Sequence, residues 1–302
     1  MVDQLLSIIK EVFSTNEVPK DWTNTLQIPI PKTLSPKETR DYRCITLCAV
    51  AYKVYAKILL ERLERQLPPF PSYQMAFQRK KSASDQIFVL RRILDERWKK
   101  GKLTIVVSLD LKQAVDCIDI SKTAPILSGM GVSNFLIKRI LKACLTEKIS
   151  IQWFGQRTQT IEKNRGIKQG CPISPILFIL ILHSVLSSLK EFVPELSLGE
   201  AERIILPIIL AYADDLLFLC DSVEDVEKII SLLEPLLASV GLEINKEKSK
   251  VLIRDPSITK NVAPDSTCTF GRYNLTLVSK LRYLGAYITS SLSREETTSE
   301  RI

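Results

Sequence analysis

The 302-residue chain has a single histidine, His183, and its seven cysteines include no CxxC pair. Zinc sites in proteins are built mostly from these two residue types at short, regular spacings, so neither a structural zinc site nor a zinc catalyst is expected. Scattered cysteines are typical of free thiols in a reducing compartment. This composition predicts an intracellular protein.

Long hydrophobic runs are also absent. The longest, residues 176–182, is much shorter than the roughly 20 residues that cross a bilayer. The first residues, MVDQLLSIIKEV, carry an early acid at Asp3 and lack the basic start and continuous apolar stretch of a signal peptide. We therefore expect a soluble protein with no membrane partner.

The remaining composition is that of a folded globular chain, with 45% hydrophobic and 25% charged residues. Its length predicts about two domains, or one large domain with lobes. Lysine and arginine exceed aspartate and glutamate by 42 to 34, a net charge of +8, which favours a polyanionic partner. Residues 76–102 hold nine basic and three acidic residues, and this stretch is either a phosphate-binding face or simply a solvated helix face.

Helices and strands are predicted in an irregular order, without strict βαβ alternation. This order favours an α+β fold in which helices lie on one face of a mainly antiparallel sheet. The apolar periodicity predicts helices at 4–13, 49–67, 82–98, 120–146, 174–192 and 223–240, strands at 27–30, 103–109, 204–212, 216–219, 244–253 and 281–288, and a hairpin over 149–161 turning at Gly155-Gln156.

Three aspartates carry the strongest chemical signal. Asp214 and Asp215 sit at a bend between two apolar runs, and Asp110 ends a buried strand. Each has an ordinary explanation, as a turn residue or the first polar residue of a loop. Together, carboxylates from neighbouring strands suit Mg²⁺, and two such ions about 3.5–4 Å apart can hold the attacking and leaving oxygens of phosphoryl transfer. This pattern by itself does not separate a polymerase from a nuclease.

A second segment, residues 165–175 (RGIKQGCPISP), combines glycines with a helix start. Gly166 and Gly170 permit backbone to approach a ligand closely, and Ser174-Pro175 begins a helix whose N-terminus could bind an anion. The alternative is a plain loop-to-helix junction, which would explain the glycines but neither Lys168 nor Gln169.

With these motifs, the chain resembles the reverse transcriptase domain of non-LTR (LINE-type) retrotransposons, and more distantly that of group II intron maturases. A dipeptide is easily matched by chance, whereas eight blocks in the same order are not. The matching blocks are residues 22–32 (WTNTLQIPIPK), 42–63, 74–87, 110–116, 166–177 (GIKQGCPISPIL), 212–215 (YADD), 241–248 and 283–285.

The resemblance implies a right-hand polymerase fold and a reaction. Fingers would take residues 1–100 and 120–165, palm 101–119 and 166–290, and the start of a truncated thumb or a tail 291–302. The implied activity is RNA-directed DNA polymerisation, in which the 3′-hydroxyl of a DNA primer on an RNA template attacks the α-phosphate of a dNTP. The compartment, nucleus or cytoplasm, and the oligomeric state are left open.

The resemblance also implies roles for individual residues. Asp110, Asp214 and Asp215 would bind two Mg²⁺ ions. Lys248 would donate a proton to the leaving pyrophosphate. The alternative is that it is one more lysine in a basic loop. The remaining roles are phosphate neutralisation by Lys32 and Arg43, a triphosphate site beside the backbone of Leu111, nucleotide and template contacts by Gln169 and Gly170, and primer contacts by Tyr212, Tyr283, Leu284 and Gly285.

Three positions depart from the family pattern. Val115 stands where an aromatic residue usually closes the floor under the sugar, which predicts weaker rejection of ribonucleotides. Cys44 replaces a usual proline, and Ala76 replaces a usual glycine, which costs about 1–2 kcal/mol if its φ is positive. These departures support an alternative, an inactive nucleic-acid-binding remnant, and an RNA-dependent RNA polymerase is a third interpretation.

Overall fold

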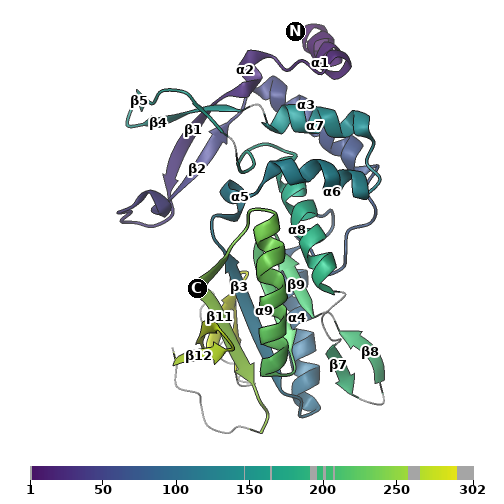
Figure 1. Ribbon diagram of the computed structural model, residues 1–302, viewed down its shortest axis with the longest axis vertical. Helices are drawn as coiled ribbons and strands as arrows, with labels where there is room; N and C mark the ends of the chain where they lie inside the picture. Colours follow the sequence, from purple (N-terminus) through teal and green to yellow (C-terminus); the bar gives the residue numbers. More distant parts are fainter. Residues whose placement is uncertain are drawn as a thin grey trace. The chain divides into compact units, whose positions relative to one another are not determined.

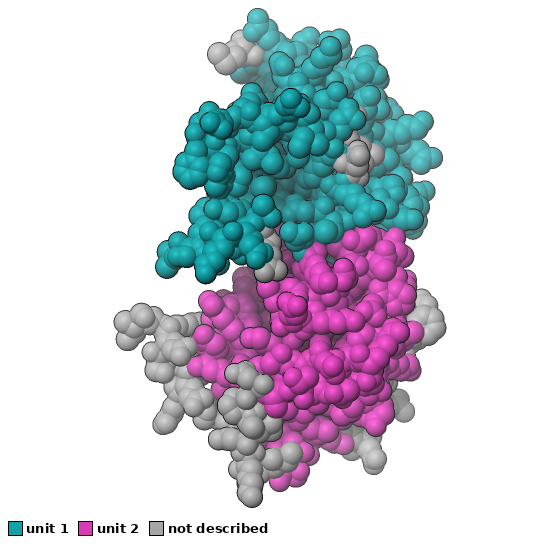
Figure 2. Space-filling model, turned by 60° about the vertical axis from the view of Figure 1, so that its left-hand side comes forward, with its two compact units in different colours: residues 1–70, 113–184 teal, residues 71–112, 185–302 magenta. Residues whose placement is uncertain are grey.

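The computed structural model describes residues 2–145, 147–163, 165–190, 196–199, 202–206, 208–257 and 266–290. They belong to two compact units, which Figure 2 colours separately. Unit 1 comprises residues 1–70 and 113–184, and unit 2 comprises residues 71–112 and 185–302. The expected lobe boundaries at 100, 119 and 165 do not coincide with these divisions, so the assignment of fingers and palm remains a prediction.

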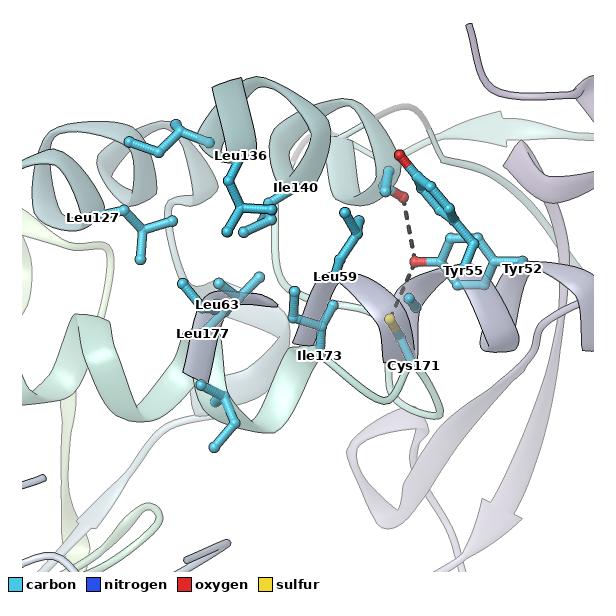
Figure 3. Close-up of a cluster of buried hydrophobic side chains, with 14 of the residues drawn as sticks. Tyr52, Tyr55, Leu59, Leu63, Leu127, Leu136, Ile140, Cys171, Ile173 and Leu177 are labelled. Carbon is cyan, nitrogen blue, oxygen red and sulfur yellow. Dashed lines mark hydrogen bonds between the residues drawn. The ribbon is translucent and has the colours of Figure 1, made fainter. Parts of the chain in front are cut away.

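An apolar cluster between helices holds unit 1 together. Leu63 on α3, Ile140 on α7 and Leu177 on α8 are almost completely buried in it (Figure 3). The hydroxyl group of Tyr52 lies at its edge, 3.3 Å from the carbonyl oxygen of Ala143. The helices of unit 1 are α1 (Val2–Thr15), α2 (Lys20–Thr23), α3 (Val50–Glu64), α5 (Ala114–Cys117), α6 (Thr123–Gly129), α7 (Asn134–Leu145) and the first turns of α8 (Ser174–Lys190), with short 3₁₀ turns η1 (Thr39–Asp41) and η2 (Ile120–Lys122).

A small sheet completes unit 1. In it β1 pairs with β2 antiparallel and with β4 parallel. The hairpin expected over residues 149–161 is present, but its turn is Phe154-Gly155, one residue earlier than expected. The long helix expected over 120–146 is divided into α6 and α7, because Gly131 between them has a φ of +84°. The strands are β1 (Asn24–Pro31), β2 (Tyr42–Leu47), β4 (Lys148–Trp153), β5 (Gln156–Arg157) and β6 (Ile161–Glu162).

Unit 2 is built on a six-stranded sheet in the order β12-β13-β11-β3-β10-β9. All its strand pairs are antiparallel except β11 with β13. The central strand is β3, whose β-branched TIVV stretch is buried, as its composition predicts. The strands are β3 (Thr104–Leu111), β9 (Ile209–Tyr212), β10 (Asp215–Cys220), β11 (Ile244–Arg254), β12 (Ser266–Phe270) and β13 (Tyr273–Leu277).

Helices cover both faces of this sheet, not one as expected. On one face, α4 (Ala83–Lys99) packs against a cluster that includes Val106, Leu217 and Leu252. On the other, α9 (Val223–Ser239) contacts β10 (Figure 1). Helix α4 begins where its pattern predicts, and Ser82 and Asp85 form a capping box at its start.

Two predicted strands are each divided in two. Residues 204–212 contribute to β8 (Glu202–Leu206), which pairs with β7 (Leu196–Gly199), and to β9 in the large sheet. Residues 281–288 form a hairpin of β14 (Lys280–Tyr283) and β15 (Ala286–Thr289). The hairpin turns at Leu284-Gly285, where φ is +48° and +83°, and two such residues in succession reverse an antiparallel pair tightly.

Three sequence-based expectations concern single features of the chain. Ala76 does not have a positive φ; its neighbour Phe77 does, at +57°, so the strain lies one residue later. The expected start of a thumb, residues 291–302, lies outside the described residues. Within the described ranges, no helix combines the length and the apolar character that crossing a membrane would require.

Candidate active site

Two carboxylates face each other at one end of the large sheet. The β10–β3 register pairs Leu216 with Leu109, and continuing it by one residue places Asp215 opposite Asp110. Side chains alternate along a strand, so both aspartates lie on the face that carries Leu217 and Val106, the face packed against α4. The pairing of β3 with β10 thus brings together acids that are far apart in the sequence.

The third aspartate sits in the turn between β9 and β10. Tyr212 pairs with Asp215, which leaves Ala213 and Asp214 as a two-residue loop. Ala213 has a φ of +56°, a conformation that costs about 1–3 kcal/mol for a residue with a β-carbon. The turn therefore needs support from its surroundings.

Gln74 provides that support. Its side-chain oxygen, in a residue only 2% exposed, accepts hydrogen bonds from the backbone N–H groups of Ala213 at 3.1 Å and Ala76 at 3.0 Å. The backbone beside it pairs with β9, since the N–H of Ala211 donates to the carbonyl of Tyr73 at 2.8 Å. Sequence reasoning included Gln74 in a matching block but assigned it no role. The signal that the sequence offered was the place of this glutamine within that block, since its burial is known only from the structure.

The three aspartates interact electrostatically. Although Asp215 is at the surface, desolvation by the surrounding chain, and then the charges of Asp214 and Asp110, raise its pKa to about 6. Among the described residues, no three His, Cys, Asp or Glu side chains are gathered tightly enough to hold a metal ion. The donor chemistry nevertheless fits Mg²⁺, because three mutually repelling carboxylates are what a divalent cation would relieve.

A bulge in β11 brings two more polar groups to Asp110. Asn245 pairs with Asp110, the register then shifts before Lys250, and the side-chain amide of Asn245 donates to Oδ2 of Asp110 at 3.0 Å. The buried hydroxyl of Ser249 accepts from the backbone N–H of Asp110 at 3.2 Å and donates to the carbonyl of Asn245 at 2.7 Å. Lys248 is exposed within the same bulge. Sequence reasoning placed Asn245 in a matching block but gave it no function, and it missed Ser249.

Tyr283, expected to contact a primer, is buried. It is 3% exposed, and its hydroxyl accepts a hydrogen bond from the side-chain amide of Gln86 at 3.4 Å. Burial raises the pKa of Tyr283, and the charge of Asp215 acts in the same direction. The side chain therefore packs inside unit 2, and the part of this segment nearest solvent is the turn at Leu284-Gly285.

The packing of the chain itself explains the two glycines of residues 165–175. A β-carbon on Gly166 would lie 2.6 Å from the carbonyl oxygen of Asp116, and one on Gly170 would lie 2.5 Å from that of Thr46. The chain's own backbone therefore approaches both glycines closely and gives each a structural reason. The contact of Gly170 with a nucleotide stays a prediction.

Lys168 and Gln169 of this segment have different surroundings. Lys168 is 2% exposed, donates to the carbonyl of Ala143 at 3.2 Å and lies 4.6 Å from the centroid of the Tyr52 ring, so it has a structural role. Gln169 is partly exposed, and its side-chain amide lies 3.3 Å from the carboxylate of Asp116. The side-chain amide of Gln169 is thus accessible to a ligand, whereas the side chain of Lys168 is not.

Among the other expected nucleotide contacts, Arg43 lies on β2, Leu111 on β3 and Val115 on α5. Burial, and then the charge of Asp116, raise the pKa of the Cys44 thiol, while Lys163 and Lys32 lower it. Arg43 is the preceding residue of β2 and therefore projects from the opposite face. Val115, on α5, is partly exposed, and Leu111 is buried in β3.

Comparison with known proteins places these features in a family context. Residues 31–288 match the family model described as "Reverse transcriptase (RNA-dependent DNA polymerase)". The retrovirus-related Pol polyprotein from type-1 retrotransposable element R2 of Popillia japonica is 31% identical over 245 residues, which cover 77% of this chain and 32% of that protein. The transposon TX1 uncharacterized 149 kDa protein of Xenopus laevis is 24% identical over 290 residues, 94% of this chain and 21% of that protein. The chain thus spans about a third or less of these relatives.

Solved structures with a similar fold include two telomerases. The apo telomerase from Candida tropicalis, truncated from its C-terminal domain, has a TM-score of 0.59 and 14% identity, covering 91% of this chain and 55% of that one. The telomerase from Candida albicans, in complex with a fragment of telomeric RNA, has a TM-score of 0.54, covering 95% of this chain and 50% of that one. At this identity the likeness concerns the fold alone, and it confirms the expected right-hand polymerase fold.

Proposed function

The chain belongs to the reverse transcriptase (RNA-dependent DNA polymerase) family, and we propose that it extends a DNA primer on an RNA template as the polymerase core of a non-LTR retrotransposon. One observation carries the proposal within the structure. Asp110 and Asp215 face each other across β3 and β10, Asp214 adjoins them, and desolvation together with the charges of Asp214 and Asp110 raises the pKa of Asp215. A pair of Mg²⁺ ions is the ligand this arrangement suits best.

The proposed reaction joins a primer to a nucleotide. The primer 3′-hydroxyl attacks the α-phosphate of a dNTP, a new phosphodiester bond forms, and pyrophosphate leaves. Asp110, Asp214 and Asp215 would hold the Mg²⁺ that this family typically uses, and when bound the ions supply the positive charge that stabilises the attacking and leaving oxygens. Lys248 is exposed in the bulge of β11 that follows Asn245, the residue paired with Asp110. It is the proposed donor of a proton to pyrophosphate.

The chain's own polar groups orient these carboxylates. Asn245 binds one oxygen of Asp110, and Gln74 supports the turn that carries Asp214. Both contacts are made by the chain's own side chains, so they restrict where the carboxylates can lie. Such preorganisation is what phosphoryl transfer requires of a protein, because positioning and charge stabilisation provide most of its catalysis.

The nucleotide and primer contacts are proposed from the family resemblance. Lys32 and Arg43 would neutralise phosphates, the backbone at Leu111 would adjoin the triphosphate, and Val115 would lie under the sugar. Gln169 and Gly170 would contact nucleotide and template. The partly exposed side-chain amide of Gln169 supports a contact with the nucleotide. Tyr212 and the turn at Leu284-Gly285 would contact the primer, with Tyr283 holding that turn from inside.

Primer extension tests the proposal. The chain is expected to extend a DNA primer on an RNA template in Mg²⁺ and to lose extension in EDTA. Asp214→Asn should abolish extension, whereas Glu224→Gln, the same change of carboxylate to amide on the exposed start of α9, should leave it unaltered. Failure of the wild type to extend, or full activity of Asp214→Asn, would contradict the proposal.

The departures at Val115 and Cys44 favour a second candidate, an inactive nucleic-acid-binding protein. The same experiment separates the two. An inactive remnant would still bind the primer–template duplex but would show no Mg²⁺-dependent extension. A polymerase that prefers an RNA primer and ribonucleotides would indicate the third interpretation.

A further inference from the structure

The hairpin of β4 and β5 ends in exposed aromatic side chains. Trp153 is 40% exposed and Phe154 is 89% exposed, and their ring centroids are 4.9 Å apart with planes at 85°. Tyr42 on β2 makes a second edge-to-face contact with Trp153, also at 4.9 Å. We call Tyr42, Trp153 and Phe154 the aromatic tip. Because Trp153 is packed between two other rings, its orientation is restrained while part of its surface stays open to solvent.

Neither local conformation nor burial accounts for Phe154. Trp153 pairs with Gln156, so Phe154 and Gly155 form a two-residue turn with φ values of +46° and +80°. Such turns favour asparagine or aspartate followed by glycine, because a large side chain resists a positive φ. Phenylalanine here is strained and also exposes an apolar ring to water. An unfavourable residue that the core does not require indicates a binding role.

The charges beside the tip favour a polyanion. Two lysines of this region are matched by acids, since Lys148 pairs with Glu162 and Lys163 pairs with Glu147. Arg157 differs, because its guanidinium donates to the hydroxyl of Ser150 at 2.8 Å. A hydroxyl holds the side chain in place without neutralising its charge. An exposed cation therefore stands three residues from Phe154, on a chain whose net charge is +8. Because Arg157 pairs with Gln152, it projects from the face of the hairpin opposite to that of Trp153, and the turn residue Phe154 lies between the two.

We propose that the aromatic tip binds single-stranded nucleic acid, with bases stacking on Phe154 and Trp153 and Arg157 contacting the phosphate backbone. Planar rings on one face of the hairpin and a cation on the other suit this partner, because every base offers an aromatic face and every nucleotide a negative charge. A duplex hides those faces inside its stack. The site lies in unit 1, apart from the aspartates of unit 2 in the chain, and binding there requires neither Mg²⁺ nor polymerisation.

The variant Phe154→Asn tests the site without disturbing the fold. Asparagine tolerates a positive φ, so the ring is removed while the turn is relieved. The matched control is Phe88→Asn on α4, where a phenylalanine 65% exposed receives the same substitution. Binding is measured by fluorescence anisotropy of a labelled oligoadenylate, and of an abasic strand of equal length, in EDTA and without dNTPs.

The wild type is expected to bind oligoadenylate more tightly than the abasic strand. Phe154→Asn should weaken oligoadenylate binding about 5- to 100-fold and leave abasic binding unchanged, since stacking contributes roughly this much per base. Phe88→Asn should retain the preference for bases. The thermal unfolding midpoint of Phe154→Asn should equal or exceed that of the wild type, which excludes misfolding as the cause of weaker binding.

Two outcomes would overturn the proposal. The first is equal affinity of wild type and Phe154→Asn for oligoadenylate, which would show that the ring binds no base. The second is concentration-dependent self-association in sedimentation that Phe154→Asn abolishes, which would make the tip a contact between copies of the chain. Loss of primer extension with intact oligoadenylate binding would instead count against the proposed polymerase alone.

Discussion

The side-chain amide of Asn245 donates a hydrogen bond of 3.0 Å to Oδ2 of Asp110, across the pair formed by β11 and β3. The contact depends on the bulge that follows Asn245, since Ser249 within it binds both the backbone of Asp110 and the carbonyl of Asn245. Bulges re-aim side chains next to functional sites. Here the bulge restricts the rotation of a carboxylate proposed to hold Mg²⁺.

Replacing Asn245 tests its role as a positioning residue. Asn245→Ala should reduce the extension rate about 10- to 100-fold and raise the Mg²⁺ concentration needed for half-maximal activity, because groups that orient metal ligands have effects of this size. The rate is measured as a function of Mg²⁺ concentration. Asn274→Ala on β13, an asparagine that binds Thr269, is the control and should change neither quantity. A slower reaction with an unchanged Mg²⁺ dependence would indicate a purely structural role.

Gln74 should stabilise unit 2 through the turn at Ala213. Gln74→Ala leaves two backbone N–H groups without their acceptor, so it should lower the free energy of unfolding by about 1–3 kcal/mol and slow extension. Ala213→Gly relieves the positive φ and should partly restore stability in the double variant. Chemical denaturation of the single and double variants measures both effects. A double variant no more stable than Gln74→Ala would show that turn strain is unimportant.

Asp215 should make stability depend on pH. Its pKa of about 6 in the folded protein exceeds the ordinary 3.8, so the folded state binds a proton more tightly than the unfolded state. The charged form therefore destabilises the fold, and this effect grows as pH rises from about 4 to about 6 and then stays constant. Because the side chain is partly solvated, the effect is of the order of 1 kcal/mol.

Unfolding of Asp215→Asn in EDTA measures this contribution. The variant should be more stable than the wild type above pH about 6 and should lose that advantage near pH 4. Mg²⁺ should stabilise the wild type more than the variant, because the cation relieves the repulsion that asparagine has already removed. A stability difference that is independent of pH would contradict the raised pKa of Asp215.

Val115 should weaken the discrimination of the polymerase between dNTPs and rNTPs. A side chain smaller than the family's usual aromatic residue leaves room for a ribose 2′-hydroxyl, so Val115→Phe should raise the preference for dNTPs over rNTPs about 10-fold or more. Single-nucleotide incorporation by the wild type and the variant measures this ratio. An unchanged ratio would show that the residue does not lie under the sugar.

Gly170 should be intolerant of any side chain. A β-carbon there would lie 2.5 Å from the carbonyl oxygen of Thr46, so Gly170→Ala should lower the free energy of unfolding by about 2–4 kcal/mol. Gly131→Ala is the matched control, because its φ is also positive but a β-carbon meets nothing within 4 Å. It should cost about 1 kcal/mol. Equal losses in the two variants would show that φ alone, not the close approach, decides the effect.

Local patterns predicted much of the framework. The capping box at Ser82, the buried strand ending near Asp110 and the bend at Asp214-Asp215 all arise from residues close together in the sequence. Two predicted strands were each wrong as single strands: residues 281–288 reverse at Leu284-Gly285, and residues 204–212 contribute to both β8 and β9. Apolar periodicity reports which face is buried, but it does not report where a strand reverses, because Leu284 reads as one more apolar strand residue.

The identity of the three aspartates, their association with apolar strands and the family to which the chain belongs were all determined by the sequence alone. Tertiary structure decided which groups surround them: Asn245 and Ser249 reach Asp110 through a bulge, and Gln74 reaches the turn from a distant segment. It also assigned Lys168 and Tyr283 to the interior. The physical reason is that strand register and burial depend on pairings between segments far apart in the chain, and a shift of one residue would turn strand side chains such as Asn245 and Tyr283 to the opposite face.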